Sequence, residues 1–366
     1  IQSCMNNIVS YAREVVSTFE ELPFSNVDSL ILSWLAYFRY PKITKVSTFS
    51  GAKLKDLYCV EYFGEMFSDT YDPESSRELF TYLACSPRFR NIILKAYTCK
   101  SDKSKQEQFS AITFKINDHF HYVAYRGTDS TIVGWKEDFN MAFRYPIRAQ
   151  EDAYDYLKKI ALRTNGDLMV GGHSKGGNLA VYALANSDDF IKRRIVKAYS
   201  HDGPGFLEEV LKSDSFQSIS NKIDKTVPKS SMIGMFLQQH ENYRVVSSNG
   251  FSVWQHNPFS WTIKGNEFEY IDDLTNDAKY FNHTLNEWVA SLTNEERERL
   301  VDILFSLIDD DVDKTDEIFK NWQTTIPNAL KVISNTDEQT KNFVKDIVKE
   351  FFSLCVKNFP ELFKKK

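Results

Sequence analysis

The spacing of apolar residues divides the chain into a mostly helical first part, a central part where strands and helices alternate, and a helical end. In VDSLILSWLAYF, residues 27–38, apolar positions recur every three or four residues, which predicts a packed amphipathic helix. Similar spacing runs through residues 1–100, with breaks at Pro23, Pro41 and Ser86–Arg88. We therefore expect an N-terminal helical segment over 1–100.

The pattern changes near residue 108, where FSAITFKI and HFHYVAYRG flank the turn pair Asn117-Asp118, as in a hairpin. Beyond it, the pattern predicts a helix at 150–164, a strand at 167–170, a helix from Lys175 and a strand at 194–200. This alternation is typical of the α/β class, with a mainly parallel central sheet flanked by helices. We expect this core to cover residues 101–290.

The chain then returns to helical spacing, and we expect a helical extension over residues 291–366. Thr293-x-x-Glu296 has the residues of a capping box and precedes the apolar run LVDILFSLI. Residues 343–355 place apolar side chains on one face of a final helix.

Charge and cysteine content exclude several classes of function. The chain has 45 Lys and Arg against 50 Asp and Glu, so it lacks the basic excess that nucleic acid binding requires. Its apolar runs are shorter than the roughly 18 residues of a membrane-spanning helix, so we expect no stable membrane insertion. Five scattered cysteines without a C-x-x-C pair argue against a zinc site and favour a reducing, cytoplasmic compartment.

The strongest chemical signal is Gly172-His173-Ser174-Lys175-Gly176, which lies between a predicted strand and a predicted helix. The glycines permit a sharp, strained turn that exposes the Ser174 hydroxyl, the arrangement called a nucleophile elbow. The Lys175 backbone N–H and the positive helix end would then face a developing oxyanion. The alternative is a glycine-rich turn of a nucleotide-binding sheet, but neither dinucleotide nor P-loop spacing is matched.

A serine nucleophile needs a base, and on such a sheet the chain order is Ser, then Asp or Glu, then His. Four histidines follow Ser174: His201, His240, His256 and His283. His256 comes shortly after the strand-like run YRVV, in a loop that can reach the carboxyl edge of the sheet. We therefore predict His256 as the base.

Two aspartates compete for the role of triad acid. Asp202 follows the strand at 194–200 directly and lies in the tight loop HDGPGF, from which it can orient an imidazole. The alternative acid is Asp224, one predicted strand later. Gly127-Thr128, at the end of a buried strand, can supply the second oxyanion donor through Thr128.

YRGTDSTIVGWKEDF, followed by GGHSKGGNLA, resembles the fungal-type (class 3) lipases of the α/β-hydrolase superfamily, whose RGT loop forms the oxyanion hole. Over most of residues 6–310 the chain is similar to a bacterial branch of that superfamily, the Mbeg-like proteins. The segments that carry this similarity are PFSNVDSLILSWLAYF, HDGPGF, VPKSSMIGMFL and QHNPFSW. The resemblance implies an α/β-hydrolase fold. The chain departs from the lipase pattern at two positions. Lys175 stands where the lipases usually have Leu after the serine. Their catalytic acid lies in D-x-V-P, whereas Asp224 lies one residue further from Val-Pro, which favours Asp202 as the acid.

These residues predict a serine hydrolase that cleaves a small-molecule acyl ester through an acyl-enzyme. Ser174 attacks, His256 transfers the proton, and Asp202 orients the imidazole, while Thr128 and the Lys175 N–H stabilise the oxyanion. No metal or organic cofactor is implied. A thioesterase or amidase with the same triad, and a non-catalytic hydrolase fold that serves as an interaction module, are the alternatives.

Overall fold

The computed structural model describes residues 6–102, 107–128, 138–237, 242–250, 252–306 and 337–363. The chain forms two compact units. The first contains residues 1–101, 108–129 and 148–274, and the second contains 102–107, 130–147 and 275–366.

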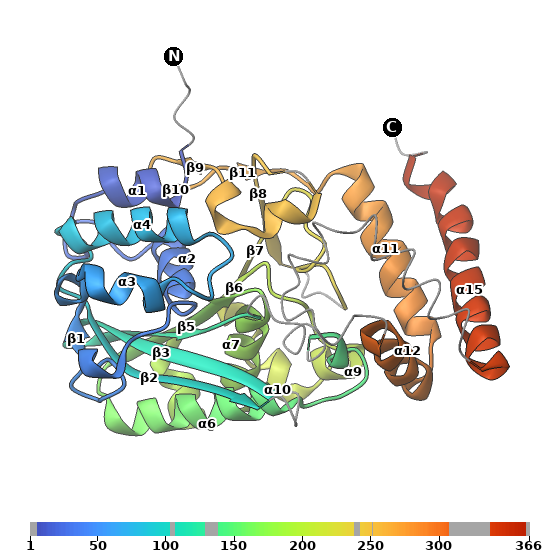
Figure 1. Ribbon diagram of the computed structural model, residues 1–366, viewed down its shortest axis with the longest axis horizontal. Coiled ribbons are helices and arrows are strands. Elements are labelled where there is room, and N and C mark those ends of the chain that lie inside the picture. Colours follow the sequence, from blue (N-terminus) through green and yellow to red (C-terminus); the bar gives the residue numbers. More distant parts are fainter. Residues whose placement is uncertain are drawn as a thin grey trace, which may run out of the picture. The chain divides into compact units, whose positions relative to one another are not determined.

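The first unit is built on a large mixed sheet (Figure 1). Within the described ranges it has nine strands, in the order β1-β2-β3-β4-β5-β6-β7-β8-β11. These strands are β1 (Ala52–Lys53), β2 (Ile93–Asp102), β3 (Glu107–Asn117), β4 (Phe120–Tyr125), β5 (Asp167–His173), β6 (Ile195–His201), β7 (Ile223–Pro228), β8 (Tyr243–Val246) and β11 (Tyr270–Ile271). Strands β4 to β8 run parallel to one another, whereas β3 and β11 pair antiparallel with β4 and β8. Strands β9 (Ile263–Lys264) and β10 (Glu267–Phe268) pair separately.

Helices cover both faces of the sheet. The helices of the first unit are α1 (Ile8–Glu14), α2 (Asn26–Leu35), α3 (Val60–Met66), α4 (Pro73–Cys85), α6 (Arg148–Arg163), α7 (Lys175–Asn186), α8 (Asp189–Arg194), α9 (Glu208–Leu211) and α10 (Asp214–Gln217). Short 3₁₀ helices are η1 (Lys42–Thr44), η2 (Leu54–Leu57), η4 (Ser220–Lys222), η5 (Ser252–His256) and η6 (Pro258–Ser260).

The side chains of β4 show which helices lie on which face. The Tyr122 hydroxyl hydrogen-bonds to Ser29 and Ser33 of α2, whereas the Tyr125 hydroxyl donates to the Ala153 carbonyl of α6. Because successive side chains of a strand point to opposite faces, α2 and α6 lie on opposite sides of the sheet (Figure 1). Helix α7 packs beside α6 and against β4, β5 and β6.

The second unit contains three described helices, α11 (Asn276–Ser291), α12 (Asn294–Ser306) and α15 (Glu338–Phe363). Helices α11 and α15 pack together, with the Trp288 and Phe351 rings 4.9 Å apart between centroids. The predicted capping box is confirmed: the Thr293 N–H donates to Glu296 Oε2 at 2.8 Å, and the Glu296 N–H donates to Thr293 Oγ1 at 3.2 Å. None of the helices in the described ranges is long and apolar enough to cross a membrane.

The fold class predicted from the sequence is confirmed: the chain has an α/β fold with flanking helices, a helical C-terminal extension and a mixed sheet whose strands β4 to β8 are parallel. The hairpin forms one residue later than predicted, because Asn117 pairs with Phe120 and the loop is Asp118-His119. The helical spacing before residue 100 does not predict β1 and β2, which lie there.

A buried ion pair joins the segments that precede the parallel strands. Arg88 donates to both carboxylate oxygens of Asp28 in α2, at 2.6 and 3.0 Å, and both side chains are fully buried. Arg88 also donates to the backbone carbonyls of Ser17, Leu22 and Pro23. One guanidinium therefore closes the loop between α1 and α2 and fixes it to the residues after α4.

Candidate active site

Ser174 lies in the turn that joins β5 to α7, and its backbone has φ 59° and ψ −136°. A positive φ is uncommon for a residue with a side chain and stores strain. The turn needs its glycines, because a Cβ at Gly172 would lie 2.2 Å from the Gly176 carbonyl carbon, and one at Gly176 would lie 2.1 Å from the Tyr125 oxygen. The junction of β5 and α7 thus has the sharp strand–turn–helix geometry of an elbow, with Ser174 as the residue between the two elements.

The loop after β4 lies against this turn. A Cβ at Gly127 would lie 2.9 Å from the Ser174 Cβ and 2.6 Å from the His173 carbonyl oxygen, so only glycine allows this approach. The next residue, Thr128, is buried, and its carbonyl accepts a hydrogen bond from the Tyr71 hydroxyl at 3.3 Å. Lys175, the other predicted oxyanion donor, is the first residue of α7. Residues 129–137 of the same motif lie outside the described ranges.

Asp202 follows β6 directly and is almost completely buried. Its Oδ2 is 2.6 Å from Nδ1 of His256, at the end of η5. A carboxylate only accepts hydrogen bonds, so Nδ1 carries the proton of this hydrogen bond, and Nε2 is the ring nitrogen that can act as an acceptor when it carries no proton. The Ser174 N–H donates to the His201 carbonyl at 2.9 Å, which joins the turn to the residue before Asp202.

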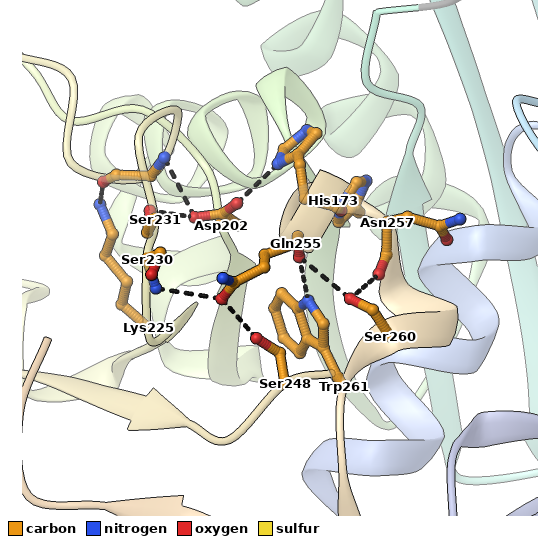
Figure 2. Close-up of polar contacts among 12 residues, drawn as sticks. His173, Asp202, Lys225, Ser230, Ser231, Ser248, Gln255, Asn257, Ser260 and Trp261 are labelled. Atoms are coloured by element: carbon orange, nitrogen blue, oxygen red, sulfur yellow. Dashed lines mark hydrogen bonds and ion pairs between the residues drawn. The ribbon is translucent and has the colours of Figure 1, made fainter. Parts of the chain in front are cut away.

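The second carboxylate oxygen of Asp202 is held by the segment after β7. Oδ1 accepts hydrogen bonds from the Ser231 hydroxyl at 2.5 Å and from the Gly234 N–H at 3.1 Å (Figure 2). With His256 on Oδ2, three donors fix the orientation of this carboxylate.

Asp224, the alternative acid, lies elsewhere on the sheet. It is the second residue of β7 and pairs in register with Tyr199, so it lies toward the amino end of its strand, whereas Asp202 follows the carboxyl end of β6. Its carboxylate accepts from Arg244 at 2.9 Å and from Lys197 at 3.3 Å. Although burial opposes it, the hydrogen bond from Arg244 and its charge hold the pKa of Asp224 below its ordinary value.

Two of the remaining histidine candidates have side-chain partners other than Asp202. His201 is buried, with Nε2 2.8 Å from the Ser29 hydroxyl and Nδ1 2.7 Å from that of Thr226. His283 lies on α11 with an exposed side chain, 3.7 Å from Glu287. His240 lies outside the described residues.

His173, which precedes Ser174, is a residue of this site that sequence reasoning missed. Its Nε2 donates to the His256 backbone carbonyl at 2.8 Å, and the two imidazole rings lie 4.4 Å apart between centroids. Its Nδ1 therefore accepts from the Tyr37 hydroxyl, at 3.0 Å. Burial lowers the pKa of His173 well below its ordinary value, so the ring is neutral. The elbow motif contains His173, whereas no local pattern points to Tyr37.

Three buried neutral histidines predict that the protein loses stability in mild acid. Burial lowers the pKa of His121 to about 4, that of His201 to about 3, and that of His173 well below 6.5. The unfolded chain binds these protons below about pH 6.5, so each histidine is expected to reduce the free energy of unfolding by about 1.4 kcal/mol per pH unit as pH falls. Urea unfolding between about pH 7 and pH 5 tests this.

The exposed His283 provides the control. His283→Gln is expected to leave the slope of stability against pH unchanged, and His201→Gln is expected to reduce it. A free energy of unfolding that stays flat over this range would contradict the prediction.

In the parts of the chain that the structure describes, no three His, Cys, Asp or Glu side chains gather in a group that could hold a metal ion.

Residues 83–306 match the Mbeg1-like family. Comparison with curated proteins finds no match. Among solved structures, the native propeptide complex of Rhizomucor miehei lipase is 13% identical, with a TM-score of 0.35 over 63% of this chain and 76% of that chain. A deletion mutant of that complex is 15% identical, with a TM-score of 0.33 over 47% of this chain and 65% of that one. M37 lipase is 14% identical, with a TM-score of 0.32 over 56% of this chain and 67% of that one. Because the family match spans more than half of its residues, the chain belongs to the Mbeg1-like family.

Proposed function

We propose that the protein is a serine hydrolase that cleaves an acyl ester through an acyl-enzyme. One observation carries the proposal: His256 pairs with Asp202 at 2.6 Å, and its ring lies on that of His173, directly before the strained Ser174. A base that is oriented by a buried acid, and that packs on the residue next to an elbow serine, suits the arrangement that nucleophilic acyl transfer needs.

In the first step, Ser174 Oγ attacks the acyl carbonyl carbon, and His256 Nε2 accepts the hydroxyl proton. The imidazolium then gives this proton to the departing alkoxide, which leaves as the alcohol. Water attacks the acyl-enzyme in the same way and releases the acid. We propose Thr128 and the Lys175 N–H as donors to the oxyanion, with the amino end of α7 adding its positive dipole.

We propose soluble esters of short or medium acyl length as substrates. An interfacial lipase needs a long amphipathic lid that exposes a large apolar surface to lipid. Between Asp202 and His256, the α-helices in the described part of the chain are α9 and α10, of four residues each. These helices are too short to serve as such a lid, which favours a substrate that reaches the site from solution.

The proposal is tested with a fluorophosphonate probe and a panel of soluble acyl esters, thioesters and amides. We expect the protein to gain one adduct by intact mass and to hydrolyse the esters, and we expect Ser174→Ala to lose both properties. Ser187→Ala is the matched control, because Ser187 is a buried serine at the other end of α7.

Three results would count against the proposal. An unlabelled wild type, or an adduct that persists in Ser174→Ala, would contradict the serine hydrolase. Hydrolysis confined to triglyceride emulsions would contradict the soluble substrate. Faster turnover of thioesters or amides than of esters would reassign the scissile bond while keeping the nucleophile.

A further inference from the structure

Lys225 of β7 is a buried lysine next to the proposed acid. The residue is 5% exposed, and its ammonium donates to the Gly234 carbonyl at 2.6 Å. Burial lowers the pKa of Lys225 to about 7, although the negative charge of Asp202 opposes this shift. Lysines are rarely buried, because an ammonium loses much hydration energy in the interior. Such a costly position suggests that this hydrogen bond has a specific role.

The segment that Lys225 anchors also binds Asp202. We call residues 231–234 the carboxylate cradle, since the Ser231 hydroxyl and the Gly234 N–H both donate to Asp202 Oδ1. A Cβ at Gly234 would lie 2.2 Å from that oxygen, so the cradle fits closely around the carboxylate. Gly234 therefore links the two charges: its carbonyl accepts from Lys225, and its N–H donates to Asp202.

The residue that precedes the cradle contacts the loop of the proposed base. The Ser230 N–H donates to the side-chain oxygen of Gln255 at 3.1 Å, and Gln255 immediately precedes His256. The Ser248 hydroxyl donates to the same oxygen, and the Trp261 indole donates to the Gln255 carbonyl at 2.8 Å. Consecutive residues after β7 thus contact both the acid and the chain beside the base (Figure 2).

We propose that Lys225 is a positioning residue for the triad: it anchors the carboxylate cradle, so that Asp202 Oδ1 is held and Oδ2 points at Nδ1 of His256. This inference rests on the proposed function. In this proposal Lys225 acts through Gly234 and Asp202, and not directly on the reacting atoms. Orientation of a triad acid by an anchored shell of donors affects the chemical step more than substrate binding.

The test replaces Lys225 with methionine, which keeps most of the volume and removes the donor. We expect Lys225→Met to lower kcat for a soluble ester by about tenfold to a hundredfold, with KM nearly unchanged. The matched control is Lys197→Met, one strand away, which removes a lysine paired with Asp224. This control is expected to keep the wild-type kcat.

A double variant distinguishes positioning from a general structural role. If Lys225 acts through Asp202, then Lys225→Met should lower kcat no further in the Asp202→Asn background. A lysine that only supports the fold would instead give losses that multiply. Should Lys225→Met fail to fold, Ser231→Ala removes one donor to Asp202 Oδ1 and leaves Lys225 in place; we expect it to lower kcat by about tenfold.

The outcomes separate the two proposals. A wild type that neither turns over esters nor reacts with the fluorophosphonate probe overturns the proposed function. A wild type that is active, together with unchanged kcat in Lys225→Met and Ser231→Ala, overturns only the positioning role. Multiplicative losses in the Asp202→Asn background would also overturn it.

Discussion

Asp202→Asn is expected to lower turnover of an acyl ester by about 10³- to 10⁴-fold and to leave the fold intact. The carboxylate accepts the Nδ1 proton of His256 at 2.6 Å. An amide at this position favours the other imidazole tautomer, whose Nε2 carries a proton and cannot accept one from Ser174. Steady-state measurement of kcat and KM, with circular dichroism as a check on folding, tests this expectation.

Asp224→Asn is the matched control for Asp202→Asn. Like Asp202, Asp224 is an aspartate with several donors, but they come from Arg244, Lys197 and Asn26, and its side chain is 11% exposed. We expect turnover to stay close to that of the wild type. The opposite ranking of the two variants would transfer the role of acid to Asp224.

The main residues of the candidate site could be chosen from the sequence because they follow predicted strands. Ser174 follows β5 and Asp202 follows β6, two neighbouring parallel strands in which His173 and His201 are in register. The carboxyl ends of parallel strands meet at one edge of a sheet, so strand order alone predicts that these side chains lie close together. The same rule disfavours Asp224 as the acid, because Asp224 lies near the amino end of β7 and not after its carboxyl end.

The supporting residues could not be predicted, because each contact joins distant parts of the chain. Tyr37 reaches His173 from 136 residues away, and no periodicity or motif connects them. Lys225 lies in a segment with the pattern of an ordinary strand, and Gly234 lies in the apolar run MIGMF, which shows no catalytic motif. Only the folded backbone shows that the Gly234 N–H and carbonyl point to opposite charges. Strand β2 could not be predicted for a different, local reason: its sequence ILKAYTCKSD mixes apolar and polar residues without strict alternation.

Arg88→Met is expected to lower the free energy of unfolding by about 3–5 kcal/mol, because it leaves the Asp28 carboxylate buried without its counter-charge. Both side chains are fully buried, and Arg88 donates to Asp28 at 2.6 and 3.0 Å. The substitution also leaves the carbonyls of Ser17, Leu22 and Pro23 without this donor. Urea unfolding monitored by tryptophan fluorescence measures the change.

Arg90→Met is the control, because Arg90 is an exposed arginine two residues away in the same turn. We expect it to change the free energy of unfolding by no more than about 0.5 kcal/mol. In the double variant Asp28→Asn with Arg88→Met neither charge of this pair remains, so the loss of stability should be smaller than the sum of the two single losses. If Arg88→Met were as mild as Arg90→Met, the guanidinium would not hold the loop between α1 and α2, and hydrophobic packing alone would keep α2 on the sheet.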